Sequence, residues 1–385
     1  MREIYFDNAA TTRVRPEVIS LMDEVMGVNY GNPSSRHILG VRAENYVKTA
    51  AQQIAQSLKV KPSEIVFTSG GTEGNNMALI GTALARKGYG RHIISTNIEH
   101  AAVYKPLEFL ESMGYEISIV GTDNKGHVDI DALKSMIRPD TILVSVMWVN
   151  NEMGAIEDIP AIGKLIKEIN PRTYFHTDAI QAYGKLTLRP KEANVDMLTV
   201  SSHKIHGPKG AGFIYINEKA HVSPIILGGG QQKDMRSGTD NVPGIAGTGL
   251  AAELYRKEHA DIEKKMLEVK DRLIDRLSEL EGVTINSERG ALSAPHVVSA
   301  SFAGVRAEVL LHALEERGIY VSSGSACSSN HPAISGTLKA IGVKQELLDS
   351  TIRFSFGIYN EPEEADICAE AIAELLPQLR RFWRH

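Results

Sequence analysis

The chain has 385 residues, 43% of them hydrophobic, and its 42 basic and 47 acidic side chains give a formal net charge of −5. This balance excludes a basic field that attracts nucleic acid or an anionic membrane, and no run approaches the roughly 20 apolar residues that span a bilayer. The opening MREIYFDNAATT has no apolar stretch typical of a signal peptide. Two cysteines, Cys327 and Cys368, are too few for a disulfide framework or a four-cysteine metal site. We therefore expect a cytoplasmic protein.

Short apolar runs predict buried strands, and segments with helical periodicity lie between most of them. The predicted strands are residues 64–69, 92–97, 141–149, 173–178, 197–202 and 212–217, and the predicted helices lie near 73–87, 101–113, 129–138 and 159–169. This alternation is typical of a mainly parallel sheet with helices on both faces.

The pattern changes near residue 245. A long charged helix is followed by HVVSASF, a helix near 306–317, TIRFSFG at 351–357 and a last helix from about 361. We therefore expect an α/β fold with two domains. The large mainly parallel α/β domain spans 16–250, and residues 1–15 and 251–385 form a smaller α+β domain.

Ligands of such sheets bind outside the carboxyl ends of the strands, so the polar residues that follow each predicted strand are candidates. In TSGGTEGNN, a tight glycine turn and the start of a helix could hold a phosphate on Gly71 and Thr72. Taken alone, an ordinary turn with Thr72 as helix N-cap is the commoner interpretation. His100 and Asn151 follow the next two strands, where structural histidines and turn asparagines are also common.

The next two strand ends carry more specific chemistry. Asp178 ends an apolar strand with Gln181 three residues on, and a carboxylate there needs a cationic partner unless it caps a helix. The following strand ends in Ser201, His203 and Lys204, and a desolvated lysine suits imine chemistry. A phosphate cradle, a carboxylate, a lysine and a histidine are together the groups that pyridoxal 5′-phosphate requires.

The two cysteines lie in opposite settings. Cys327 lies in YVSSGSACSSNHPAISG, whose small polar residues predict a flexible, exposed loop, although a free cysteine is normally buried. Cys368, in ADICAEAIAELL, falls on the apolar face of a predicted helix.

At this point the motifs resemble a known family. DNAATT, GNPSSRH, TSGGTEGNN, IEH, VNNEMG, SSHKIHGPKG, GGGQQKDMRSGTDN, SSGSACSS and RFSFG occur in this order across residues 7–357. Together they resemble the NifS/IscS-type cysteine desulfurases, pyridoxal-phosphate enzymes with the aspartate-aminotransferase fold (fold type I). SSGSACSS resembles the class with a long mobile cysteine loop. The sequence ends at FWRH without the extended tail of IscS-type members, so the resemblance leans towards NifS-like members.

The resemblance implies a role for each matching residue. Lys204 would bind the cofactor covalently and carry the Cα proton, Asp178 would pair with the ring nitrogen, and Gln181 would bind the ring hydroxyl. His100 would stack on the ring and act as acid and base. The remaining cofactor residues implied are Gly71, Thr72, Asn151, Ser201 and His203, together with Thr239, which would reach the phosphate of a neighbouring subunit.

The resemblance also implies how the substrate is bound and where its sulfur goes. Asn151 and Arg353 would hold the carboxylate of L-cysteine, and a planar guanidinium suits a carboxylate independently of any family. Cys327 would take the sulfur as a persulfide and leave L-alanine. No metal is implied as a requirement of the enzyme, and Cys327 is the residue that could ligate an iron–sulfur cluster transiently.

The implied function is that of a homodimeric cysteine desulfurase that passes sulfur to an acceptor or iron–sulfur scaffold protein. A selenocysteine lyase or a related class V aminotransferase-type enzyme would use the same lysine, aspartate and phosphate cradle. The cysteine loop argues against an aminotransferase, which needs no thiol. A binding protein for a phosphate ligand or a sulfur carrier is the alternative without catalysis.

Overall fold

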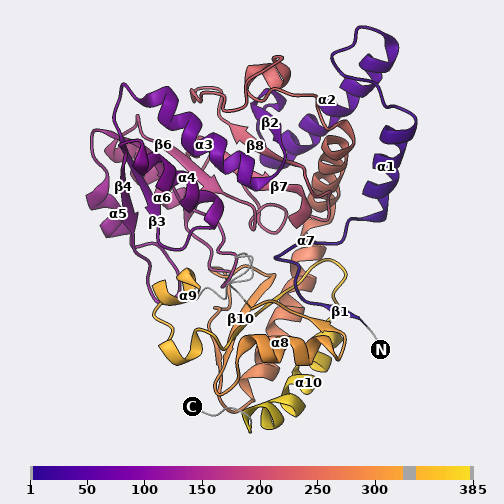
Figure 1. Cartoon of the computed structure of the whole chain (residues 1–385), viewed down its shortest axis with the longest axis vertical. Coiled ribbons are helices and arrows are strands. Elements are labelled where there is room, and N and C mark those ends of the chain that lie inside the picture. The colour runs from indigo at the N-terminus through magenta and orange to yellow at the C-terminus, as the bar shows by residue number, and fades with distance from the viewer. Residues whose placement is uncertain (1–2, 324–334, 382–385) are drawn as a thin grey trace.

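The computed structural model describes residues 3–323 and 335–381. Figure 1 shows a larger part that contains most of the strands and helices, above a smaller part formed by the C-terminal elements. Cys327 lies outside the described residues. No helix in the described part of the chain has both the length and the apolar composition that crossing a membrane needs.

A seven-stranded sheet forms the centre of the larger part. Its strands are β2 (Ile65–Thr68), β3 (His92–Thr96), β4 (Glu116–Val120), β5 (Thr141–Ser145), β6 (Tyr174–Asp178), β7 (Met197–Ser201) and β8 (Gly212–Ile216). The order is β2-β8-β7-β6-β5-β3-β4. Neighbours from β7 to β4 run parallel, and β8 runs antiparallel to both of its neighbours. The predicted mainly parallel sheet is therefore confirmed.

Helices cover both faces of this sheet, because successive strand residues point to opposite sides. Ile93 and Leu143 pack in one core with residues of α3 (Gly71–Arg86) and α4 (Ala101–Ser112). Their chain neighbours Ile94 and Val144 pack in the other core, with residues of the helices on the far side. Those helices are α2 (Ile38–Leu58), α5 (Ile130–Met136), α6 (Ile159–Ile169) and the first part of α7 (Val242–Ser278), with α1 (Pro16–Gly27) packed against α7.

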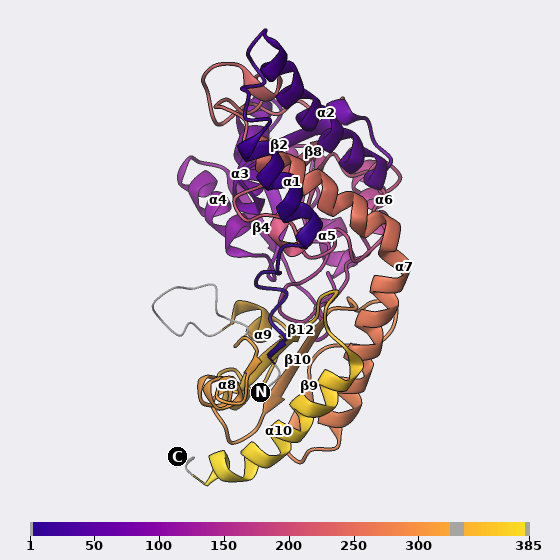
Figure 2. The same ribbon diagram turned by 90° about the vertical axis from the view of Figure 1, so that its right-hand side faces the viewer.

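The smaller part is built on an antiparallel sheet in the order β12-β10-β9. Its elements are β9 (Val283–Ile285), β10 (Val297–Phe302), β12 (Thr351–Ser355), α8 (Ala307–Glu315), α9 (Gly336–Ala340) and α10 (Pro362–Arg380). The first strand of the chain, β1 (Ile4–Tyr5), pairs in parallel with β11 (Ile319–Tyr320), so the N-terminal segment packs with C-terminal elements. Figure 2 shows α7 running from the larger part into the smaller one. Helix α7 continues past residue 250, where the large domain was predicted to end. The division into 16–250 and 1–15 with 251–385 therefore stays a prediction.

Two sequence predictions differ from the structure. The apolar run 141–149 predicted one strand, but β5 ends at Ser145 and the residues after it form irregular backbone at the edge of the sheet. Strand β4 was not predicted, because it is the edge strand and only its last residue is buried. An edge strand needs no continuous apolar run.

Candidate active site

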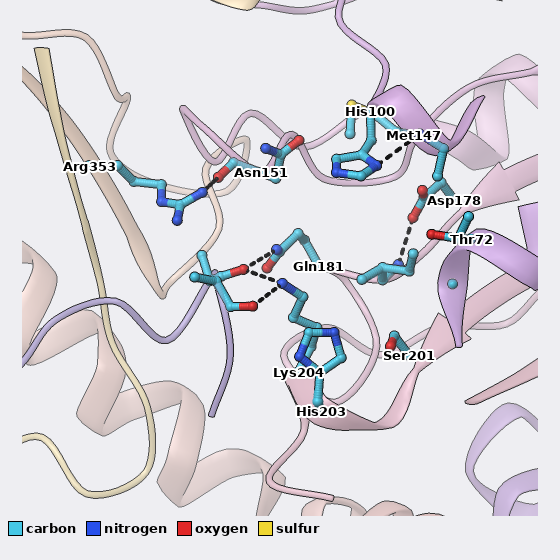
Figure 3. A pocket seen from close by; sticks show the side chains of 15 residues that line it. Thr72, His100, Met147, Asn151, Asp178, Gln181, Ser201, His203, Lys204 and Arg353 are labelled. Carbon is cyan, nitrogen blue, oxygen red and sulfur yellow. Dashed lines mark hydrogen bonds between the residues drawn. The ribbon is translucent and has the colours of Figure 1, made fainter. Parts of the chain in front are cut away.

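A cavity of about 260 Å³ lies where the carboxyl ends of the parallel strands face the smaller sheet (Figure 3). The residues that the sequence singled out meet in its wall: Gly71, Thr72, His100, Asn151, Asp178, Gln181, Ser201, His203, Lys204 and Arg353. Sequence reasoning missed Ala9, Ala10, Ala102, Met147 and Ile180, which line the same cavity. Thr239 is exposed and does not line this cavity.

The amine of Lys204 is held by backbone from the other end of the chain. Lys204 ends a 3₁₀ turn, Ser202–Lys204, that follows β7. Its Nζ donates to the carbonyl oxygens of Ala9 and Ala10, at 2.6 Å each. Behind it, Lys185 Nζ donates to the Lys204 carbonyl oxygen at 2.6 Å. Burial, and then the charge of Lys204, lower the pKa of Lys185 to about 7.

Asp178 is a buried carboxylate that ends β6, as the sequence predicted. Its Oδ2 accepts from Asn75 Nδ2 at 2.7 Å, and its Oδ1 accepts from the backbone N–H of Ile180 at 3.0 Å. Burial raises the pKa of Asp178, although these bonds and the charges of His100 and Lys204 oppose the shift. No helix follows Asp178, so it is not a helix N-cap. A protonated ring nitrogen would supply the cation that a buried carboxylate needs.

Other residues pack closely against the backbone of the turn before α3. Gly70 has φ +147°, a conformation that side chains disfavour. A Cβ on Gly71 would lie 2.1 Å from Ile180 Cδ1. The helix N-cap is Gly70, so the alternative of Thr72 as N-cap is wrong. The first N–H groups of a helix have no partner within it, and they favour an anion.

Two polar side chains face this helix start from β7 and the turn that follows it. Ser201 and His203 line both the main cavity and the hollow that adjoins it beside α3. His203 Nδ1 lies 3.1 Å from Thr11 Oγ1. Burial, and then the charge of Lys204, lower the pKa of His203 to about 3, so the ring stays neutral and can donate one hydrogen bond. A phosphate fits a site built from helix N–H groups, a hydroxyl and a neutral imidazole.

His100 caps the start of α4 with its ring. Its Nδ1 accepts from the backbone N–H of Ala102 at 3.0 Å, which fixes that nitrogen as the unprotonated one. Figure 3 shows the ring at the cavity wall, beside Asp178. The structural and the functional interpretation of His100 are therefore compatible, since the bond that caps the helix also orients the ring.

Arg353 is the cation at the opposite side of the cavity. It lies on β12 with only 5% of its side chain exposed. Its Nη1 donates to the carbonyl oxygen of Asn151 at 3.0 Å, and its Nη2 contacts Asp7 Oδ1 at 2.9 Å. A carboxylate is the natural ligand for the remaining donors of a guanidinium.

Glu99, directly before His100, gives a prediction about pH. Its buried Oε1 accepts from Thr96 Oγ1 at 2.9 Å and from the Met147 N–H at 2.8 Å. Burial raises the pKa of Glu99 to about 8. The carboxyl group binds its proton more tightly in the folded than in the unfolded protein. Its contribution to the free energy of unfolding is therefore complete below about pH 4.5, the ordinary pKa, and is lost as the pH rises through the folded value of about 8. The cost is about 1.4 kcal/mol for each unit of pKa difference.

The variant Glu99→Gln should remove this loss, because an amide keeps an oxygen for both bonds and does not titrate. We expect its free energy of unfolding to fall less than that of the parent protein between pH 5 and pH 8. Urea unfolding of both proteins at pH 5, 6, 7 and 8 measures the difference. Parallel pH curves for the two proteins would show that Glu99 ionises normally in the fold.

The remaining candidates lie elsewhere. Cys327 lies outside the described residues. Cys368 is fully buried on α10, as predicted, and burial raises the pKa of its thiol. Among the described residues, no group of three His, Cys, Asp or Glu side chains is arranged to hold a metal ion.

Comparisons with known proteins match nearly the whole chain. The family model described as Aminotransferase class-V matches residues 4–367. The cysteine desulfurase IscS of Dictyoglomus turgidum is 41% identical over 98% of this chain and 96% of its own length. A solved NifS-like protein superposes with a TM-score of 0.93 at 37% identity, over 98% of this chain and 100% of its own. The structure of SspA in complex with cysteine superposes with a TM-score of 0.82 at 32% identity, over 93% of this chain and 99% of its own.

Proposed function

The chain belongs to the class-V aminotransferase family, as a pyridoxal-phosphate-dependent cysteine desulfurase of fold type I, and from this premise we propose how its cavity removes sulfur from L-cysteine. The observation that carries the proposal is the meeting of the Lys204 amine, the buried Asp178 carboxylate and the start of α3 in one cavity. These residues fit pyridoxal phosphate, since they offer an amine, a partner for a pyridinium and an anion site. When bound, the cofactor supplies an aldehyde for the substrate amine and a ring that accepts electrons from Cα.

Each cofactor residue has a role in this proposal. The N–H groups of Gly71 and Thr72, with Ser201 and His203, hold the phosphate. Asp178 keeps the ring nitrogen protonated, and its burial strengthens that ion pair because little water screens it.

Gln181 would donate to the ring hydroxyl of the bound cofactor, and His100 would stack on its ring and transfer protons. Gln181 Nε2 now donates to the Ala9 carbonyl oxygen at 2.9 Å, so it already points to the edge of the cavity where Lys204 lies.

The reaction is assigned to four residues. Arg353 and Asn151 hold the substrate carboxylate, and the amine of Lys204 removes the Cα proton. The Cys327 thiolate forms a bond to the substrate sulfur while the bond from that sulfur to carbon breaks. The electron pair of the broken bond takes a proton at Cβ, Lys204 returns a proton to Cα, and the product leaves as L-alanine, while the sulfur remains as a persulfide on Cys327. Only the thiolate form is a good nucleophile for this step.

The test is the product balance with L-cysteine. The purified protein loaded with pyridoxal phosphate should show a visible absorption band that borohydride removes. With L-cysteine it should form alanine and protein-bound sulfane sulfur in equal amounts during the first turnover. Turnover of selenocysteine alone would favour a selenocysteine lyase, and amino transfer to a keto acid would favour an aminotransferase. Absence of the band would favour the non-catalytic binding protein.

We also propose that the protein is a homodimer, with Thr239 of each chain reaching the phosphate of the other. Several large apolar side chains are exposed. The exposed fraction is 53% for Met26 on α1, 70% for Tyr30 just after it and 80% for Leu227. An interface between two chains would cover these side chains. Light scattering at micromolar concentration should give about twice the 42.1 kDa of one chain. A fully active particle of one chain's mass would contradict the dimer.

The persulfide needs an acceptor. We propose a sulfur-acceptor protein or an iron–sulfur scaffold protein in the cytoplasm, with transient cluster ligation by Cys327. Radioactive sulfur from L-cysteine should appear on such a protein only when Cys327 is intact. Equal transfer by a variant that lacks Cys327 would contradict this route.

A further inference from the structure

The guanidinium of Arg353 is fixed before any substrate arrives. Asn151 holds Nη1 through its carbonyl oxygen at 3.0 Å, and Asp7 holds Nη2 through Oδ1 at 2.9 Å. Figure 3 shows the first of these bonds and the arginine pointing to the cavity. The buried Nε has no hydrogen-bond partner among the described residues. The two contacts therefore determine where the guanidinium lies and leave other donors for a ligand.

Asp7 belongs to the N-terminal segment that also holds Lys204. It directly follows β1 and Phe6, and its backbone bridges Ser355, two residues after Arg353 on β12. Residues 9 and 10 of the same segment accept the bonds from Lys204 Nζ. One short stretch of chain therefore positions both cations of the cavity, through carbonyl oxygens at Lys204 and through a carboxylate at Arg353.

The side chain of Asp7 is not needed to attach this segment to the smaller sheet. The Ser355 N–H donates to the Phe6 carbonyl oxygen at 2.7 Å, and the Asn8 N–H donates to the Ser355 carbonyl oxygen at 3.2 Å. The Ala9 N–H also donates to Ser355 Oγ at 2.8 Å. Backbone and serine bonds fix the segment on both sides of Asp7, so its carboxylate is left with Arg353 as its hydrogen-bonded partner.

Holding an arginine in advance has a physical benefit. A free arginine side chain loses rotamer entropy when it binds a ligand, and a side chain that is already ordered does not pay this cost again. A charge-assisted bond is the strongest means of ordering it. Asn151 and Asp7 each accept one hydrogen bond from a terminal nitrogen of Arg353. The other N–H groups of its guanidinium therefore remain available to a carboxylate.

We propose that Asp7 is a positioning residue that holds Arg353 in place for the carboxylate of the amino-acid substrate. The inference rests on the proposed function, which assigns that carboxylate to Arg353. It predicts that Asp7 governs the affinity for ligands that carry a carboxylate and leaves the bond-breaking steps at their normal rate.

The experiment compares Asp7→Ala and Asp7→Asn with the parent holoenzyme. Binding of L-alanine, followed by the absorption change of the bound cofactor, should weaken about tenfold in Asp7→Ala, and the KM for L-cysteine should rise equally while kcat stays within about twofold. In Asp7→Asn an oxygen still accepts from Nη2 without charge, so the loss should be about threefold. Ethylamine, which is alanine without its carboxylate, should bind all three proteins equally.

Two further variants separate the possible failures. Glu3→Ala removes an exposed acid from the same segment and should leave alanine binding unchanged, which controls for net charge. Arg353→Ala tests the proposed function itself. If Arg353→Ala weakens alanine binding and neither Asp7 variant does, the inference about Asp7 is wrong. If Arg353→Ala has no effect, the assignment of the carboxylate to Arg353 is wrong.

Two other outcomes would also overturn the inference. Weaker binding of ethylamine in Asp7→Ala would show that Asp7 supports the shape of the whole cavity. A fall in kcat with unchanged KM would place Asp7 in the chemical step. Should Asp7→Ala not fold, Asp7→Asn carries the test, since a threefold loss confined to alanine supports the inference and unchanged binding contradicts it.

Discussion

Replacing Lys204 with alanine is expected to abolish covalent attachment of pyridoxal phosphate. Lys204 is the single lysine among the described residues that line the main cavity, and the Ala9 and Ala10 carbonyl oxygens keep its amine there. Borohydride reduction of the holoenzyme followed by peptide mass spectrometry should place the adduct on the peptide that contains Lys204. The variant should show no adduct and no measurable turnover, because the amine that binds the cofactor also moves the Cα proton.

Two neighbouring lysines make this prediction specific. Lys209 lines the adjoining hollow, and Lys185 is buried behind the Lys204 backbone with a pKa lowered to about 7. Lys209→Ala should keep the adduct on Lys204, which makes it a matched control. An adduct on the peptide of Lys209 or of Lys185 in the parent protein would show that the lysine was assigned wrongly.

The sequence predicted the side-chain part of this site well, because of how a parallel sheet is built. Asp178 and Ser201 end two strands that are adjacent in the sheet, Lys204 follows the second of them, and the carboxyl ends of parallel strands share one edge. Once buried apolar runs located the strands, the polar residues behind them were predicted to converge. The identity of each strand's neighbours was not needed for that argument.

The contribution of the N-terminal segment could not be predicted in this way. Ala9 and Ala10 act through backbone carbonyl oxygens, which every residue has, so their sequence carries no chemical signal. Asp7 reaches Arg353 across 346 residues of chain, because the segment after β1 bridges Ser355 on β12. Strand β1 has two residues and is too short to show a period, so DNAATT carries no chemical signal beyond the resemblance.

The two cysteines should behave oppositely, because the sequence places them in opposite settings. Alkylation of the native protein should modify Cys327 first and stop the release of sulfur. Cys368 is buried within α10 with a raised thiol pKa, so it should react only after unfolding. Cys368→Ala is the control: it should lower stability by roughly 1 kcal/mol and leave turnover intact. Faster labelling of Cys368 in the native protein would contradict this order.

Cys327→Ser should keep the absorption band of the bound cofactor and still bind L-cysteine, because these depend on Lys204, Asp178 and Arg353. It should form no persulfide at this position and should form alanine more than about 100-fold more slowly, since a hydroxyl is far less acidic than a thiol and provides almost no anion to attack sulfur. The activation free energy would therefore rise by more than about 2.7 kcal/mol. Alanine formation from L-cysteine at the parent rate would show that sulfur leaves without Cys327. In that case the persulfide step would be wrong, and the cavity would act as a lyase that uses the cofactor and no thiol of its own.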